Sequence, residues 1–308
     1  MEDRLCFVQF MHPGGEHETK GDTIAWNTGA HKRKFLKNDG RYLHDGKLSE
    51  GEIGFWGEWE PESQVVDHIV NPVPEHPHFI YNPYYVMPVT DEGQQNTDPF
   101  VFGDRPLYSC CRQHTRKGGP SQLQRLQVGS VLLFGSCLNK SKFVLDTVFV
   151  VDHYDDFNLN DLEKLRDHVS NTFVDATLSR LPSNNQRFDR STVTFRLYSG
   201  ATFEQQRHGM YSFFPCAPYE ESPFGFARPQ IRLPGIITDN LFMGKKLNPQ
   251  DNIDVVVSLW NAVREQALDQ GVYIGVSTQS PPEYLQDGSV QRNEKQGQGR
   301  VPVRRSAC

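Results

Sequence analysis

The stretch SVLLFGSCLNKSKFVLDTVFVVDHY, residues 130–154, holds two apolar runs separated by a short polar connection. The runs 130–137 and 142–154 are rich in Val, Leu and Phe, which β-strands favour. The connection 138–141 contains Asn, Lys and Ser and has the length of a hairpin loop. We therefore expect an antiparallel β-hairpin here and a fold in which strands predominate.

The strand pattern extends toward the N-terminus from this hairpin. Short β-favouring runs separated by Pro, Gly and Asn fill residues 52–155, and another run lies at 4–12. Short strands at such spacing are typical of a small barrel or a strongly bent sheet. We expect one of these two arrangements in the N-terminal half.

The pattern changes after residue 155. Apolar residues recur at steps of three and four over 158–181, which predicts one amphipathic helix. A second helix is expected over 252–270, ended by Gly271, and strands are expected at 192–200 and 272–278. The expected fold class is α+β, with a bent sheet or small barrel first and a mixed α/β half after it.

Three regions follow from this division. Residues 1–155 form a β-rich region, 156–285 an α/β region with two amphipathic helices, and 286–308 a tail rich in Gln, Gly and Arg that we expect to be disordered. A single merged domain is the alternative for the first two regions, and the sequence does not predict an oligomeric state.

Composition excludes several classes of protein. The formal net charge of -6 excludes non-specific coating of nucleic acid, which requires many cations, so any nucleic-acid contact is local. The six cysteines include no CxxC pair, which argues against a zinc ribbon or a disulfide framework. No membrane-length apolar stretch and no secretory signal occur, so we expect a cytoplasmic protein without a membrane partner.

The segment GEIGFWGEWEP, residues 51–61, places tryptophans beside glutamates. Alternation along a strand would set Phe55, Gly57 and Trp59 on one side. It would set Trp56, Glu58 and Glu60 on the other. We expect one side to pack inward and the other, with Trp56 and Glu58, to bind a planar base. Trp59 is a further candidate for base binding. The alternative is that Trp56 covers a barrel end and the glutamates are solvated.

A basic run near the N-terminus is a candidate phosphate site. Asn27 or Thr28 could cap a short helix reaching Lys37, followed by a turn at residues 38–40. Free N–H groups at the helix start, together with nearby cations, would bind phosphate. The candidate cations are Lys32, Arg33 and Lys34. A solvated helix face is the alternative.

Nine of the eleven histidines precede residue 155, which raises the question of a metal site. The segment HPGGEH offers His12, Glu16 and His17, but its Pro-Gly-Gly core cannot form the helix on which metalloprotease ligands lie. We therefore expect no metal and no cofactor. If the protein is catalytic, His12, Glu16 or Glu58 is the candidate general base.

Two stretches resemble known families. Residues 128–154 resemble the turn, strand and hairpin of the PUA-like superfamily, whose members include EVE, ASCH and YTH domains. The resemblance covers residues 52–155 at most. It implies a small barrel with an aromatic-lined pocket for a modified or flipped base, with Trp56 and Trp59 as the lining.

Residues 195–216 resemble the first conserved block of ADP-ribosyltransferases. That resemblance implies an NAD site made by Arg196, Tyr198 and Tyr211, although the catalytic glutamate of such enzymes is not evident in this sequence.

The main hypothesis is an intracellular protein that binds a nucleotide or a base in nucleic acid, with catalysis on the bound nucleotide left open. An NAD-consuming enzyme similar to ADP-ribosyltransferases is the first alternative. A non-catalytic protein-interaction module, using the aromatic-rich stretch 200–235, is the second.

Overall fold

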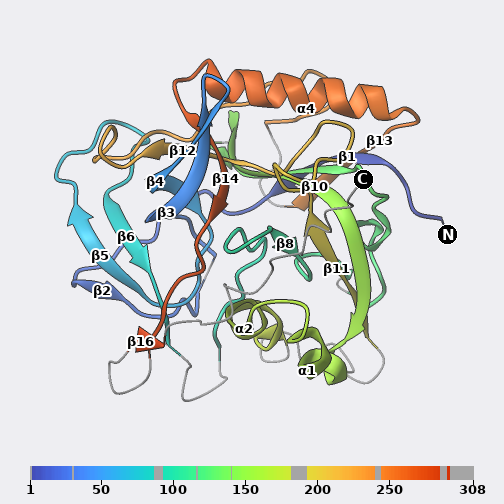
Figure 1. The fold of residues 1–308 in the computed structure, drawn as a ribbon, viewed down its shortest axis with the longest axis horizontal. Helices are drawn as coiled ribbons and strands as arrows, with labels where there is room; N and C mark the ends of the chain where they lie inside the picture. The colour runs from blue at the N-terminus through green and yellow to red at the C-terminus, as the bar shows by residue number, and fades with distance from the viewer. Residues whose placement is uncertain are drawn as a thin grey trace, which may run out of the picture.

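The computed structural model describes residues 2–29, 31–86, 93–115, 117–139, 141–181, 193–239, 244–284 and 290–291. Two large mixed sheets lie side by side, and the long helix α4 (Ile253–Leu268) lies along one edge of the pair (Figure 1). The α+β class expected from the sequence is confirmed.

The first sheet has six strands. Their order is β13 (Gly244–Pro249), β1 (Cys6–Met11), β9 (Val131–Leu138), β10 (Lys142–Asn158), β11 (Thr194–Gly200) and β8 (Leu107–Tyr108). The expected hairpin is confirmed as β9 and β10, which pair antiparallel, with a register shift between Leu145 and Thr147. The expected strand near the N-terminus is confirmed as β1, which lies parallel to β9.

The second sheet has seven strands. Their order is β14 (Tyr273–Thr278), β12 (Phe214–Pro218), β4 (Lys47–Gly57), β3 (Lys34–His44), β6 (Phe79–Pro83), β5 (Ser63–His68) and β2 (Thr23–Ile24). Because β14 also pairs with β3, the strands β14, β12, β4 and β3 form a closed circuit. Two of these four strands come from beyond residue 210, so the circuit is not the barrel expected within 52–155. A small third sheet joins β7 (Tyr85–Val86), β15 (Glu283–Tyr284) and β16 (Val290–Gln291).

Alternation within β1 explains how the first sheet is buried on both faces. Phe7 and Met11 pack into the core beneath α4, whereas Val8 and Phe10 pack into a core on the opposite face. The helix contributes Val256, Trp260, Val263 and Ala267 to the first of these cores. The prediction of α4 is confirmed, and its Trp260 is buried in this core.

The helix expected over 158–181 is wrong as a single element. The chain forms the short segments η2 (Leu159–Asp161), α1 (Leu162–Leu165), α2 (Asn171–Phe173) and η3 (Val174–Leu178). Ser170 starts a new helical segment because its side chain accepts the N–H of Phe173. The short segments can each turn apolar side chains toward the core between the sheets. A single straight helix would contact that core along only one of its faces.

The helix expected to end at Lys37 is also wrong. Residues 34–44 and 47–57 instead form the hairpin of β3 and β4, which pair over their whole length. The turn lies at Asp45 and Gly46, whose φ angles of 49° and 74° suit a tight hairpin turn. The turn expected at residues 38–40 lies within β3 instead.

The two regions expected on either side of residue 155 share their sheets. Strand β10 runs through that position, and both large sheets take strands from before and after it. The expected disordered tail 286–308 lies outside the described residues except for β16. None of the described helices combines the length and apolar character needed to cross a membrane.

Candidate metal centre

The pairing of β3 with β4 brings charged side chains together where the hairpin leaves the sheet. Lys34 lies opposite Gly57 in the ladder. Continued by three residues, the same register places Arg33 opposite Glu58 and His31 opposite Glu60. In the structure Arg33 contacts Glu58, and His31 contacts both glutamates.

His31 lies between the two carboxylates. Its Nδ1 is 2.9 Å from Oε1 of Glu60 and 3.3 Å from Oε1 of Glu58. One ligand atom from each of the three residues lies within 4.8 Å of the others. Both glutamates are buried, whereas 30% of the His31 side chain is exposed, so the group reaches solvent on the side of the imidazole.

The second oxygen of each glutamate is anchored on the side away from His31. Oε2 of Glu58 accepts from Nη1 of Arg33 at 3.0 Å and lies 3.1 Å from Nδ1 of His12. Oε2 of Glu60 accepts from the amide of Asn27 at 2.5 Å. Each carboxylate is therefore held by one oxygen and turns the other toward His31.

A buried ion-pair network supports Glu58 from the neighbouring sheet. Arg33 donates through Nε to Asp146 at 2.8 Å, and Asp146 also accepts from Arg228 at 3.3 Å. Asp146 lies at the register shift of β10, where a bulge turns a side chain away from the normal alternation. The sequence of contacts Glu58, Arg33, Asp146, Arg228 thus joins the two large sheets through alternating charges.

Two buried imidazoles adjoin the carboxylates. Nδ1 of His12 and Nε2 of His17 are buried and make no hydrogen bond, although the latter lies 3.9 Å from Oε2 of Glu60. Burial, with the cation of Arg33, lowers the pKa of His12, and burial beside Lys34 lowers the pKa of His17 to about 3. Both rings are neutral at pH 7, which is the form that binds metals.

The pKa values of His31 and Glu58 are shifted in opposite directions. Burial would lower the pKa of His31, but its hydrogen bonds to Glu58 and Glu60 outweigh burial and raise that pKa to about 10. Burial would raise the pKa of Glu58, but the contacts with the imidazoles of His12 and His31 and with the guanidinium of Arg33 hold that pKa well below its usual range. At pH 7 the cation beside Oε1 of both glutamates is therefore the protonated ring of His31, and a metal ion that binds there must replace its Nδ1 proton.

Asp98 closes the inner side of the centre. Its N–H lies 3.4 Å from Oε1 of Glu58, and its carboxylate accepts the N–H groups of Ser109, Cys110 and Cys111. Burial raises the pKa of Asp98 to about 6 and also raises the pKa of both cysteine thiols. These thiols are protonated and so are poor metal ligands.

The predicted catalytic residues separate in the structure. His12 and Glu58 come together in the centre, as described above. Glu16 does not, because its carboxylate accepts the N–H groups of His78 and Phe79 and holds that loop. Its role as a general base is therefore a wrong prediction.

The predicted base-binding surface is wrong. Trp56 is 4% exposed, packs against Phe35 and donates from Nε1 to the carbonyl of Phe226. Trp59 is 1% exposed and donates to the carbonyl of Glu62. The alternation along this segment is as expected, since the two indoles enter different cores. Neither ring offers a free face to a ligand, because segments distant in sequence cover both.

The predicted phosphate site is wrong for two of its three cations. No helix begins near Lys32 in the described chain, and Arg33 is committed to the ion-pair network. Lys34 is buried and donates to the carbonyl of Pro61 and the hydroxyl of Ser63. Burial lowers the pKa of Lys34 to about 7. Lys32 alone is partly exposed.

The residues of the alternative NAD site do not assemble. Arg196 pairs with Asp3 and Asp156. Tyr198 is buried in the core on the face of the first sheet away from α4, and Tyr211 is buried beneath α4. Of the seven aromatic side chains in 200–235, three are buried, three are partly buried and Phe224 is exposed, and an interaction surface there stays a prediction.

His31, Glu60, Asp146 and Arg228 were not predicted as site residues. The Asp45-Gly46 dipeptide is a strong hairpin signal and would have set the register that brings His31 to Glu60. Nothing in the local sequence marks Asp146 or Arg228.

No family model, curated protein or solved structure matches this chain.

Proposed function

We propose that this protein is a metal-dependent enzyme that binds one divalent cation through His31 Nδ1, Glu58 Oε1 and Glu60 Oε1, and that the ion replaces the proton which the raised pKa of His31 keeps on Nδ1 at pH 7. The observation that carries this proposal is the orientation of the two carboxylates. Each has one oxygen anchored by its neighbours and turns the other toward the same imidazole nitrogen. Such anchoring of the outer ligand atoms is what metal sites use to hold their ligands in place.

The donor set favours particular ions. Imidazole nitrogen suits Zn²⁺ and Fe²⁺, whereas carboxylate oxygen also suits Mn²⁺. Mg²⁺ and Ca²⁺ prefer sites made of oxygen alone. We therefore propose Zn²⁺, Mn²⁺ or Fe²⁺ as the ion, and the neutral ring of His12 or His17 as a further ligand after a small movement.

Three protein ligands leave coordination positions open for water or substrate. Solvent reaches these three residues from the side of His31, whose side chain is 30% exposed, so water or substrate would approach a bound ion from that side. A bound cation lowers the pKa of its water to about 7 and polarises a substrate oxygen, which are the two requirements of hydrolysis. Metal-assisted hydrolysis is thus the reaction class that we propose.

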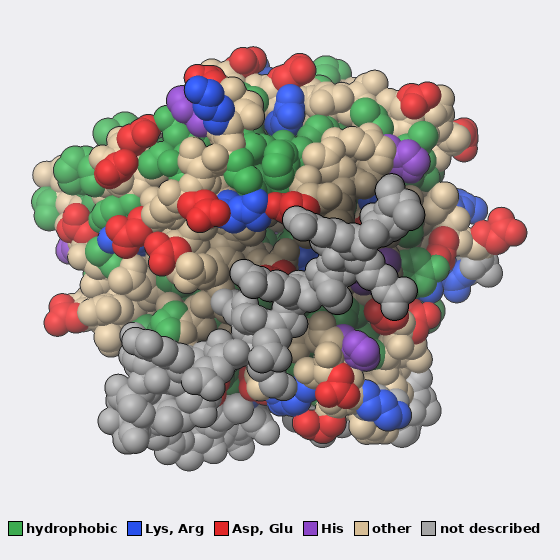
Figure 2. Space-filling view, viewed as in Figure 1, with side chains coloured by type: hydrophobic (Ala, Val, Ile, Leu, Met, Phe, Trp, Pro, Cys, Tyr) green, Lys and Arg blue, Asp and Glu red, His purple; other side chains and the backbone are tan. Residues whose placement is uncertain are grey.

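A nucleotide or a phosphodiester in nucleic acid is the substrate that we propose, because phosphate oxygens bind divalent cations readily. Figure 2 shows basic and acidic side chains intermingled on the face it displays, so the described side chains there form no broad basic surface of the kind that coats nucleic acid. The PUA-like barrel and the cytoplasmic location remain part of the proposal on sequence grounds.

Metal titration tests the proposal directly. Chelator-treated protein is titrated with Zn²⁺, Mn²⁺ and Co²⁺ by calorimetry, and the Co²⁺ complex is followed by its visible spectrum. We expect one ion per chain, with affinity reduced at least about 100-fold in Glu60→Gln and His31→Asn, since ligands contribute more than the residues that support them. Glu52→Gln and His208→Asn, both exposed and outside the centre, are the matched controls.

Two results would contradict the proposal. Wild-type protein that binds no stoichiometric ion removes the metal centre, as does equal loss of affinity in the control variants. If the protein binds metal but does not hydrolyse bis(p-nitrophenyl) phosphate or nucleotides, the proposed substrate class is wrong and the metal centre is unaffected.

A further inference from the structure

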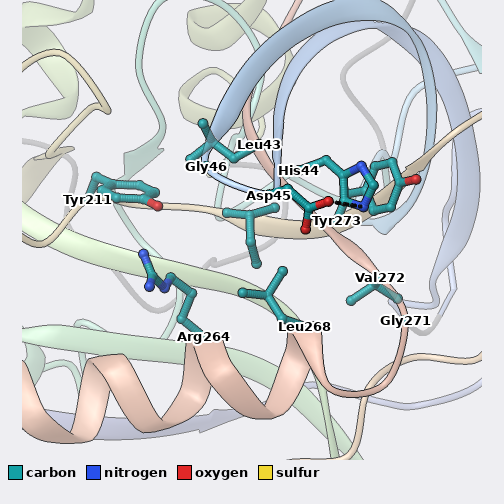
Figure 3. A pocket seen from close by; sticks show the side chains of 11 residues that line it. Leu43, His44, Asp45, Gly46, Tyr211, Arg264, Leu268, Gly271, Val272 and Tyr273 are labelled. Atoms are coloured by element: carbon teal, nitrogen blue, oxygen red, sulfur yellow. Dashed lines mark ion pairs between the residues drawn. The ribbon is translucent and has the colours of Figure 1, made fainter.

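A cavity lies at the turn end of the β3–β4 hairpin, opposite to the end that carries the metal centre. It occupies about 440 Å³ between the hairpin turn, the start of β14 and the C-terminal half of α4. That volume falls in the range of small-molecule sites. Figure 3 shows Arg264 projecting from α4 on one side and His44, Asp45 and Tyr273 on the other. This cavity contains none of the residues of the metal centre.

Arg264 is the cation of the cavity. Its Nε is buried without a hydrogen-bond partner, and among the described residues no carboxylate forms an ion pair with it. Its guanidinium lies 5.5 Å from the ring centre of Trp260, a contact that satisfies none of its N–H groups. In Figure 3 the guanidinium points toward Tyr211 rather than toward the rim where Asp45 pairs with His44.

The remaining walls are apolar or aromatic. Leu43, Leu268, Val272 and Ile274 contribute aliphatic surface. The ring of His44 stacks on Tyr273 with centroids 4.0 Å apart and an interplanar angle of 12°, which forms a flat wall across the cavity from Arg264. A flat apolar body placed against these walls would bring its charged group to Arg264.

We propose that this cavity binds a small organic monocarboxylate with a flat apolar body. The planar guanidinium fits a carboxylate through two parallel hydrogen bonds. A single negative charge fits better than two because Asp45 lines the rim and the C-terminal end of α4 adds negative potential. Inorganic phosphate has no apolar body to pack against the aliphatic and aromatic walls, so it fits the cavity less well.

Nuclear magnetic resonance of the arginine side chains tests this site on the full-length protein. The probes are benzoate and indole-3-acetate, with benzamide as the uncharged analogue and inorganic phosphate as an anion without an apolar body. We expect both carboxylates to shift the Nε–H resonance of Arg264, and benzamide and phosphate to bind at least tenfold more weakly. Arg264→Gln is expected to weaken carboxylate binding at least tenfold, whereas Arg232→Gln, an exposed arginine near α4, is expected to leave it unchanged.

Three results would overturn the proposal. The first is the lack of any shift with either carboxylate, and the second is unchanged affinity in Arg264→Gln. The third is binding of benzamide or phosphate as tight as that of benzoate. The outcome is independent of the metal titration, because no residue of this cavity belongs to the metal centre.

Discussion

The two ends of the β3–β4 hairpin differ in how their charged groups are satisfied. At the buried end, Arg33, Glu58 and Glu60 each contact oppositely charged or polar partners, and the contacts continue to Asp146 in the other sheet. At the turn, roughly 30 Å away for strands of this length, Arg264 faces an open cavity without an acidic partner among the described residues.

The physical reason for this difference is water. A charge removed from water destabilises the fold unless partners replace its hydration, so the buried end needs a complete network. At the open end Arg264 is only partly buried, so water can solvate part of its guanidinium although Nε is buried, and a ligand can replace that water. We infer that the residues at the buried end stabilise the fold as well as supporting the proposed metal site. Residues that line the cavity can be replaced without loss of the fold.

Arg33→Met should have the largest effect. It leaves Glu58 and Asp146 buried without their shared cation, and breaking such a network costs about 3–5 kcal/mol. Urea denaturation measures this loss, and Arg232→Met is the control for removal of an exposed arginine. A loss below about 1 kcal/mol would show that the network is not needed for stability.

Addition of metal should have the next largest effect. An ion at 100 times its dissociation constant stabilises the folded state by about 2.7 kcal/mol if it binds only that state. Thermal unfolding with and without Zn²⁺ or Mn²⁺ measures the gain. We expect the gain to disappear in Glu60→Gln and to persist in Glu52→Gln; a gain that is equal in both variants would place the ion elsewhere.

Gly46→Ala should destabilise the open end of the hairpin by about 1–2 kcal/mol. The residue has φ of 74°, where a Cβ atom is strained even though nothing lies within 4 Å of it. Gly51→Ala on β4 also meets no atom within 4 Å, and its backbone is not left-handed. Urea denaturation of the pair isolates the backbone strain, and equal stabilities would contradict the assigned turn.

Arg264→Gln should have the smallest effect on stability. Because its guanidinium has no ion-pair partner to lose, we expect a change within about 0.5 kcal/mol in urea denaturation. Comparison with Arg33→Met measures directly how much more an arginine contributes to the free energy of unfolding at the buried end than at the open end. A loss as large as that of Arg33→Met would mean that Arg264 is a structural residue.

Elements with a strong local pattern could be predicted from the sequence. The hairpin of β9 and β10 and the helix α4 have continuous apolar patterns, and their partners in the core need not be known to recognise them. The chain from 158 to 181 also has helical spacing, yet it breaks at Ser170 because its short segments must follow a curved core. Local spacing cannot indicate the shape of the surface that a helix will cover.

The candidate site illustrates the same limit. His12 and Glu58 were recognisable as ionisable residues beside glycines, but their partners were not. A competing turn signal at residues 38–40 concealed the one at Asp45 and Gly46, and with it the register that joins His31 to Glu60. The eleven-pair ladder of β3 and β4 overrides the local preference of Asn38, Asp39 and Gly40 for a turn.

The sequence by itself determined the α+β class, the main hairpin, the long helix and the alternation that separates Trp56 from Trp59. Only the tertiary structure decided that Phe226 and Arg228 cover Trp56 and that Asp146 reaches Arg33 from the other sheet. Alternation and apolar spacing act between neighbours in the chain, so they can be read locally. Burial and charge pairing depend on which distant segments meet, and those contacts exist only in the folded protein.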